Sequence, residues 1–469
     1  MHNKAIVHIL TKARMESDAF NAEIDAMEEL SEKYEIKNVL FYKWDVIKFD
    51  ALISKLEKFH ILCKNYSNKD DLKEQVLELW KENEIVFIDT PLELLVNTVN
   101  DLKEAIWRPM SDNPDIFRDK FLQRELIQEH NPELWIKFIK WTPEKLDIKD
   151  IEEKVWYPFI IKPVDWVQSS WVAKISNKSE FDEYISNYND FHDRLKSRWV
   201  DSKELIVEEF INWKLYSIDY FVSSEWEIRV SKPVKVRLWI DVKVDDYCNI
   251  ARIATEKTEW EFKWKRLKTF INWTIKATWI RNTFVHHEFK INSKWDLKTI
   301  ELNGRIWGGR MELLKRAYDF NLYELLLNPD AKPWKLKESN IAVNIYATKR
   351  GILTWFNEKV LSRIEARETV YAIKYDECFI WKEIWLTKDW FIKVWVIKLK
   401  NKDYSLLSKD FAYIKSKYSE LLEIEDIKPW HVVKKVKKTK KVFLEKPKNK
   451  IKNVFWKITW IFKKIKNRN

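Results

Sequence analysis

The combination of very few glycines with very many tryptophans restricts what this chain can fold into more than any other feature. Its 469 residues include 4 Gly and 27 Trp. Ordinary usage near 7% predicts about 33 glycines at this length, and tight turns need residues that reach positive φ. Trp213, Trp226 and Trp295 stand in polar contexts typical of Gly-containing hairpins. The pattern predicts that most printed Trp occupy glycine positions, as in a gene that reads UGA as glycine; a truly Trp-rich protein is the alternative.

Composition excludes several classes of protein. With 46% hydrophobic and 34% charged residues, the chain can form two or three packed domains, which excludes a disordered chain. Cys63, Cys248 and Cys378 are far apart and never in CxxC spacing, so neither structural disulfides nor a zinc site are expected. The sequence shows neither a signal peptide nor an apolar run of 18 residues. We therefore expect a cytoplasmic protein.

The positive charge is concentrated at the C-terminus. The net charge is +12, and residues 430–469 hold 15 Lys and Arg against the single acid Glu445. The rest of the chain is close to neutral, so no nucleic-acid partner is expected for it. The basic tail, residues 426–469, is expected to be flexible. The alternative is an amphipathic helix over 454–466 that contacts an anionic membrane or RNA.

The order of predicted elements indicates a mixed fold, α/β followed by α+β. Strands and helices alternate over residues 1–105, which predicts a small parallel α/β domain. Residues 106–330 are richer in antiparallel strands, and residues 331–425 form a small strand-rich segment. The predicted strands are 5–10, 37–42, 61–66, 85–89, 157–162, 172–175, 205–210, 215–222, 227–236, 284–291 and 297–302, and the predicted helices are 21–33, 50–58, 70–83, 116–129 and 180–188.

One motif in the middle of the chain suits phosphate binding. Lys162 ends the apolar strand 159–162, and the polar loop 165–171 follows at once. With glycine at positions 166 and 171, this loop could turn its N–H groups towards phosphates. A surface hairpin with an exposed lysine is the alternative.

A second motif suits a divalent cation. Glu301 and Asn303 share one face of a strand because side chains repeat every two residues, and Glu288 on a paired strand could join them. Two carboxylates and an amide oxygen are ligands that Mg²⁺ accepts beside a triphosphate. Arg305, again two residues on, would stabilise a charged intermediate. Acids on the solvated face of a hairpin are the alternative.

Taken together, residues 114–325 resemble the ATP-grasp superfamily, and in particular its carboxylate–amine ligases of the L-amino-acid-ligase type. The motifs that carry the resemblance are residues 157–165, 169–172, 207–213, 216–219 and 301–310. The family has glycine where this chain prints Trp at 156, 166, 171, 213 and 307, which supports the recoding interpretation. The resemblance implies an ATP-grasp fold with an N-terminal parallel α/β domain, a lid over about 150–212 and a small strand-rich C-terminal segment.

The resemblance also implies roles for individual residues. Arg305 and Lys162 would be catalytic, Arg305 and Arg310 would contact substrate, and Mg²⁺ or Mn²⁺ would be held by Glu288, Glu301 and Asn303. Leu215 stands where many relatives have a ribose-binding Glu, so the ribose contact is left open. The residues implied in ATP binding are Lys120, Lys162, Asp165, Trp166, Ser169, Ser170, Trp171, Val172, Glu208, Glu209, Phe210 and Ile211; the last four would form a hinge that reads adenine through backbone groups.

The expected function is ATP- and Mg²⁺-dependent ligation of a carboxylate to an amine through an acyl-phosphate, with small-molecule substrates and an amino acid among them. A homodimer is left open. The alternatives are another ligase or carboxylase of the same fold, in nucleotide or cofactor biosynthesis, and a non-catalytic ATP-binding protein. A Trp-rich surface binder attached by its tail is a further alternative from another class.

Overall fold

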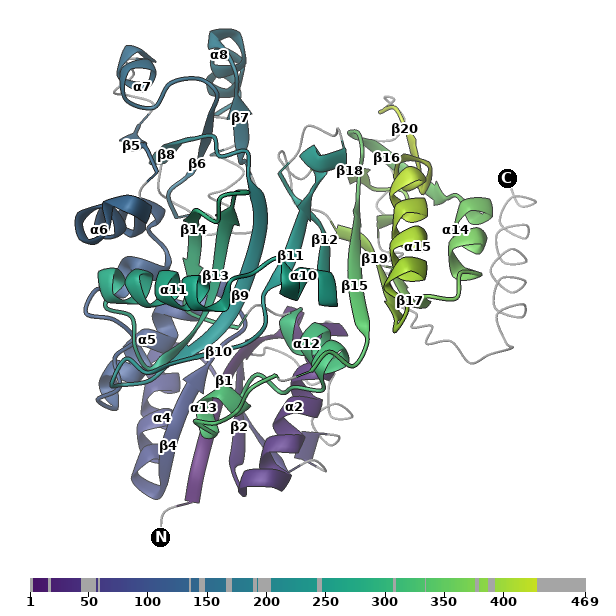
Figure 1. Cartoon of the computed structure of the whole chain (residues 1–469). Helices are drawn as coiled ribbons and strands as arrows, with labels where there is room; N and C mark the ends of the chain where they lie inside the picture. Colours follow the sequence, from purple (N-terminus) through teal and green to yellow (C-terminus); the bar gives the residue numbers. More distant parts are fainter. Residues whose placement is uncertain are drawn as a thin grey trace.

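The described residues form four β-sheets with helices packed on them (Figure 1). The computed structural model describes residues 3–15, 18–43, 56–57, 60–134, 136–142, 148–165, 171–188, 192, 204–242, 247–306, 309–333, 335–375, 379–386 and 393–427. Most of the predicted helix 50–58 and nearly all of the basic tail lie outside these residues. No helix within the described ranges is both long enough and apolar enough to cross a membrane. Within these residues, neither Cys63 nor Cys248 forms a disulfide.

The N-terminal sheet is parallel, as the alternation of elements predicts. Its strand order is β3-β2-β1-β4, and every pairing is parallel. The apolar residues of β1 are fully buried because helices cover the sheet. The strands are β1 (Asn3–Thr11), β2 (Lys37–Lys43), β3 (Ile61–Tyr66) and β4 (Asn83–Asp89), and the helices are α1 (Lys12–Met15), α2 (Asp18–Tyr34), α4 (Lys69–Glu82) and α5 (Val96–Ala105).

A small antiparallel sheet projects from the rest of the molecule, at the top of Figure 1. Its strand order is β5-β8-β6-β7, and with two helices it encloses its own hydrophobic cluster. It covers the segment predicted as a lid. Its elements are β5 (Phe138–Trp141), α7 (Ile148–Lys154), β6 (Phe159–Pro163), β7 (Ala173–Ile175), α8 (Lys178–Ser186) and β8 (Leu205–Glu209).

The large sheet has nine strands, with the path β14-β13-β9-β11-β12-β15-β19-β17 and β10 paired to β9. It runs through residues 214–401, so strand pairing is continuous across the predicted domain boundary at 330. The predicted strand 227–236 forms two strands because Pro233 between them has no N–H to donate. The strands are β9 (Lys214–Val222), β10 (Ile228–Val230), β11 (Val234–Leu238), β12 (Asn249–Ala254), β13 (Thr283–Ile291), β14 (Leu297–Asn303), β15 (Ser339–Tyr346), β17 (Val370–Tyr375) and β19 (Lys393–Asn401).

Helices connect this sheet to the rest of the chain. The predicted helix 116–129 is a short 3₁₀ turn, η2 (Pro114–Phe117), followed by α6 (Lys120–His130), because Asp119 caps the second helix. The other helices beside the sheet are α10 (Glu256–Trp260), α11 (Trp264–Thr278), α12 (Arg310–Tyr318) and α13 (Glu324–Leu327), and the C-terminal part adds β16 (Gly351–Phe356), α14 (Glu358–Glu365), β18 (Glu383–Ile384), α15 (Tyr404–Ser416) and β20 (Leu422–Glu425).

Tryptophan is over-represented where the backbone is left-handed. Eleven described residues other than glycine have positive φ, and seven of them are Trp. A β-carbon is disfavoured in this region of φ, which glycine enters without cost. Glycine would be unstrained at these positions; that the Trp there stand for glycine stays a prediction. The seven are Trp107, Trp156, Trp171, Trp226, Trp279, Trp295 and Trp381.

Candidate active site

The hairpin of β13 and β14 brings the predicted metal ligands together. In its register Glu288 lies opposite Glu301, and His286 lies opposite Asn303. The Oδ1 atom of Asn303 is buried and has no hydrogen-bond partner among the described residues. An unpaired buried acceptor beside two carboxylates suits a divalent cation, so the residues present fit Mg²⁺.

The three predicted ligands, Glu288, Glu301 and Asn303, would leave some coordination positions of a bound Mg²⁺ open for a phosphate or water. No group of three or more His, Cys, Asp and Glu side chains in the described ranges is arranged to hold a metal. Two carboxylates and one amide oxygen cannot saturate an octahedral ion, and Mg²⁺ commonly takes further ligands from phosphates and water. The site therefore suits an ion that arrives with a phosphorylated substrate.

Helix α6 positions Lys120 over this hairpin. Asp119 accepts hydrogen bonds from two N–H groups of the first turn, and Lys120 Nζ lies 3.1 Å from Glu301 Oε1. Burial alone would lower the pKa of Lys120, but the charges of Glu301 and Glu93 outweigh it and raise that pKa. Further along the helix, Gln123 bonds both the N–H and the carbonyl of Leu302. The helix is thereby fixed along β14.

Lys162 belongs to a buried group of three charges. Its Nζ lies 2.7 Å from Glu208 Oε2, and Arg124 Nε of α6 lies 2.8 Å from Glu208 Oε1. Burial lowers the pKa of Lys162 despite this partner, whereas the two cations hold the pKa of Glu208 below its usual range against the effect of burial. The N–H of Lys120 donates to Val164 O at 3.2 Å, beside the predicted phosphate loop. Both predicted phosphate-binding lysines therefore border one site.

Arg305 is oriented by a residue that the sequence analysis did not single out. Its Nη2 donates to Glu93 Oε2 at 2.9 Å, and Glu93 follows directly after the carboxyl end of the N-terminal sheet strands. Burial raises the pKa of Glu93, and Arg305 opposes that shift. Ligands of α/β sheets bind beyond the carboxyl ends of strands. The position of Glu93 shortly after β4 is therefore a feature of the sequence that could have identified it as a site residue.

Gly304 allows the backbone next to Arg305 to pack closely against Met110 and Phe117. A β-carbon there would lie 2.8 Å from Met110 Cε and 2.9 Å from the ring of Phe117. Since a rigid ring cannot give way easily, any side chain would push the backbone that carries Asn303 and Arg305.

Arg310 lies in a buried network rather than on the surface of the site. Its Nε is 3.2 Å from Asp219 Oδ2, and it also bonds Ser217. His286 Nδ1 contacts the other oxygen of Asp219 at 3.0 Å, and its Nε2 lies 3.7 Å from Glu288. Burial would raise the pKa of Glu288, but His286 and the nearby Arg252 and Arg310 hold it low. The network keeps Glu288 ionised; contact of Arg310 with a substrate stays a prediction.

The predicted hinge joins the small sheet to the large one. The N–H groups of Glu209 and Phe210 donate to Lys137 O and Pro158 O, and Ile211 O accepts from Lys290. The side chain of Glu208 is engaged by Lys162 and Arg124. An adenine-reading role would fall to the remaining backbone groups of this segment, and it stays a prediction.

An apolar cluster beside the hinge suits a planar base. It includes the predicted cofactor residues Val172 and Phe210 and collects side chains from both the small and the large sheet. Apolar walls with a few polar groups are typical of small-molecule sites. Other members of this cluster are Ile160, Leu215 and Ile300.

The predicted phosphate loop is described only at its two ends. Trp166, Ser169 and Ser170 lie outside the described residues. Asp165 Oδ1 is buried without a hydrogen-bond partner in the described part of the chain, and burial raises the pKa of this carboxyl. At the other end, Trp171 has a φ of 58°, and its carbonyl accepts from Tyr184.

Comparison with known proteins bears on the family and the fold of this chain. Residues 155–312 match the sequence profile of the ATP-grasp domain. No curated protein matches in sequence. Among solved structures, L-amino acid ligase from Bacillus licheniformis superposes with a TM-score of 0.65 at 16% identity, covering 91% of this chain and 100% of that chain.

Two further solved structures contain nucleotide. N5-carboxyaminoimidazole synthetase from Staphylococcus aureus, complexed with ADP, has a TM-score of 0.58 at 14% identity and covers 88% of this chain and 96% of that chain. The biotin carboxylase domain of Hydrogenobacter thermophilus 2-oxoglutarate carboxylase, with MgADP and bicarbonate, has a TM-score of 0.54 at 13% identity and covers 91% and 92%. The profile match and the shared fold lead to one conclusion: this chain contains an ATP-grasp domain set in the overall fold of the ATP-grasp ligases.

Proposed function

We propose that this protein is an ATP- and Mg²⁺-dependent carboxylate–amine ligase that forms an amide or peptide bond through an acyl-phosphate. The observation that carries the proposal is the β13–β14 hairpin, where Glu288, Glu301 and Asn303 lie beside Lys120 and just before Arg305. The fold shared with an L-amino acid ligase over 91% of the chain supports an amino acid as substrate.

Each residue of this site would have its own role in the reaction. Glu288, Glu301 and Asn303 would hold Mg²⁺, which supplies neutralisation of phosphate charge when bound. Lys120 and Lys162 would bind phosphate oxygens of ATP. Catalysis of this kind depends mainly on positioning and on charge stabilisation.

Arg305 would act on the second half of the reaction. Its guanidinium is held by Glu93 and can donate to the anionic oxygens of an acyl-phosphate and of the tetrahedral intermediate. The amine displaces phosphate from the acyl carbon, and the phosphate leaves with the electron pair of the broken C–O bond. The small substrates expected here and a cytoplasmic location belong to the same proposal.

The first test is ADP release with Mg²⁺ and ATP across pooled amino acids, using a gene with glycine at every Trp position that UGA encodes and Trp at the others. ADP that depends on particular pools supports the ligase. ATP binding without ADP release in any pool would favour a different carboxylate substrate or a non-catalytic binder.

A variant tests the metal assignment. Glu301→Ala should lower turnover at least about 100-fold, since loss of a group that stabilises charge in the transition state typically costs this much. The matched control is Glu423→Ala, an exposed glutamate of β20, which should keep full activity. Amino-acid-dependent ADP release at the parental rate in the folded Glu301→Ala protein would refute the assignment.

A further inference from the structure

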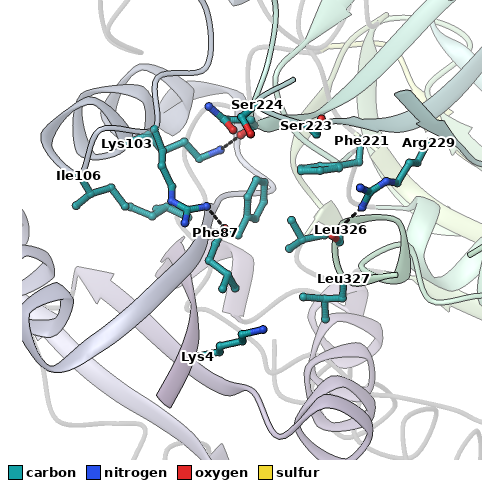
Figure 2. Close-up of a pocket in the computed structure, with 14 residues that line it drawn as sticks. Lys4, Phe87, Lys103, Ile106, Phe221, Ser223, Ser224, Arg229, Leu326 and Leu327 are labelled. Atoms are coloured by element: carbon teal, nitrogen blue, oxygen red, sulfur yellow. Dashed lines mark hydrogen bonds between the residues drawn. The ribbon is translucent and has the colours of Figure 1, made fainter. Parts of the chain in front are cut away.

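A cavity lies apart from the candidate active site, between the N-terminal sheet and the large sheet. Its volume is about 270 Å³. Figure 2 shows Lys103 and Ile106 on one side of it, Phe221 and Arg229 on the opposite side, and Lys4 at the edge. The lining residues are Lys4, Val86, Phe87, Ile88, Lys103, Ile106, Arg108, Phe221, Ser223, Ser224, Arg229, Asn282, Leu326 and Leu327.

The lining is cationic. Four of these residues are Lys or Arg, and none of the fourteen is acidic. Arg229 is paired with Glu227 and donates to the carbonyls of Leu325 and Leu326. The Arg108 guanidinium donates a long hydrogen bond from Nη1 to Val86 O, at 3.3 Å. The cavity therefore has an excess of positive charge.

Lys103 is the most deeply buried of these cations. It is 2% exposed, and its Nζ donates to Asn282 O at 2.8 Å and lies 3.9 Å from the centre of the Phe87 ring. A buried ammonium without a carboxylate partner is costly. Burial lowers the pKa of Lys103 to about 7, with Asp89 opposing the shift and Arg108 adding to it. An anion in the cavity would supply the missing counter-charge.

Besides the neutral polar residues Ser223, Ser224 and Asn282, the remaining wall is apolar and sets the shape of a ligand. Phe87, Ile106 and Phe221 meet Leu326 and Leu327 around the cavity. The volume is slightly below the range of about 300–1,000 Å³ that is usual for drug-sized ligands. A molecule that fits carries one acidic group and a short hydrocarbon body.

The cavity lies apart from the ligase site, and its lining shares no residue with that site. Asn282 precedes β13, and the six residues from there to Glu288 span roughly 20 Å of extended strand. Lys4 stands at the amino end of β1, whereas Glu93 of the ligase site follows the carboxyl end of β4. None of the lining residues is Trp, so glycine at the Trp positions would change no side chain of the lining itself.

We infer that this cavity is a binding site for a small aliphatic or aromatic carboxylate, held by Lys103 and Arg108 with its hydrocarbon body against Phe87 and Phe221. Binding takes up a proton, because the carboxylate favours the charged form of Lys103. This site is independent of the proposed ligase reaction.

The test is isothermal titration calorimetry of the full chain with 4-methylpentanoate, using the neutral 4-methylpentanamide as control. The acid should bind about tenfold more weakly at pH 8 than at pH 6, since only about one in eleven free Lys103 side chains is charged at pH 8 if its pKa is 7. Titrations at pH 8 in two buffers of different ionisation enthalpy should show uptake of close to one proton.

Matched variants locate the binding. Lys103→Met should weaken binding at pH 6 at least about tenfold and remove both the pH dependence and the proton uptake, and Arg108→Gln should weaken binding but keep the proton uptake. Lys73→Met, an exposed lysine of α4, should behave like the parent. Absence of binding at millimolar acid, equal binding of the amide, or a loss in Arg305→Ala but not in Lys103→Met would each overturn the inference; the last would place the acid in the ligase site.

Discussion

At the scale of single residues, four of the Trp positions lie in two contrasting environments. Trp107, Trp156 and Trp381 have positive φ and are at least half exposed, at 84%, 68% and 50%. A β-carbon in the left-handed region costs about 1–2 kcal/mol, and an exposed ring recovers little of it. Trp395 lies within β19, is fully buried and packs 4.5 Å from the ring of Phe356. We propose that the first group are glycine positions and that Trp395 is a true tryptophan.

This division predicts codons and stabilities. Positions 107, 156 and 381 should be encoded by UGA, and position 395 by UGG. In the chain as printed, Trp156→Gly should raise the free energy of unfolding by about 1 kcal/mol, whereas Trp395→Gly should lower it by about 3 kcal/mol or more. Gene sequencing and urea denaturation check both; UGG at the three exposed positions would contradict the division.

The residues of the ligase site differ in how far the sequence reveals them. Glu301, Asn303 and Arg305 are spaced two apart on one strand, so their alignment follows from the alternation of side chains. Glu93 is 212 residues from its partner Arg305, and Lys103 is 179 residues from Asn282. Contacts at such separations depend on how the sheets pack, which local spacing does not encode.

At the scale of elements, two helices begin in the same way but differ in what they carry. Asp119 caps α6 by accepting from Phe121 N and Leu122 N, and Asp403 caps α15 by accepting from Ser405 N and Leu406 N. Only α6 presents a predicted phosphate contact, Lys120, in its first turn.

Substitution of the two capping residues separates an effect on stability from an effect on ATP binding. Asp119→Ala and Asp403→Ala should each lower the free energy of unfolding by about 1 kcal/mol. Asp119→Ala should also raise the KM for ATP severalfold because the first turn that carries Lys120 loosens, whereas Asp403→Ala should leave it unchanged. Denaturation curves and steady-state kinetics at saturating amino acid measure the two effects. Equal KM values in the two variants would show that the cap does not position Lys120.

Most elements of the N-terminal sheet follow from the sequence, since β1, β2, β3 and β4 contain apolar runs between helix-length segments. Helix α11 does not: its N-cap is Lys263, whose side chain makes no capping hydrogen bond, and Trp264 and Trp273 within it weaken the helical pattern. Packing of its buried face against the core stabilises this helix, since its local sequence signals are weak.

At the scale of the whole molecule, polar contacts join β4 and α2 of the N-terminal part to the start of α13. Tyr323 Oη donates to Asp89 Oδ2 at 2.5 Å in the interior, and Lys33 Nζ lies 2.7 Å from Glu324 at the edge. Burial and the nearby Asp89 raise the pKa of Tyr323 well above its usual value, so its hydroxyl stays protonated and keeps donating.

Tyr323→Phe tests this junction. It removes the donor to the buried Asp89 and should lower the free energy of unfolding by about 1–3 kcal/mol. Tyr404→Phe in α15 is the matched control and should change it by less than about 0.5 kcal/mol. Urea unfolding followed by circular dichroism measures both, and an equal, small effect of the two substitutions would mean that the hydroxyl does not stabilise the junction.

The strands of the small sheet, β5-β8-β6-β7, all lie within one segment of the chain, residues 138–209. Its four strands pair only with one another, and its first strand β5 lies antiparallel to its last strand β8. The chain therefore enters and leaves it at neighbouring points, where Glu209 N donates to Lys137 O at 2.9 Å. Residues 138–209 could be excised and the ends joined by a short linker without removing any strand pair of the large sheet. The segment predicted as a lid is thus an insertion in the topology, which a related chain could replace while keeping the carboxylates of β13 and β14.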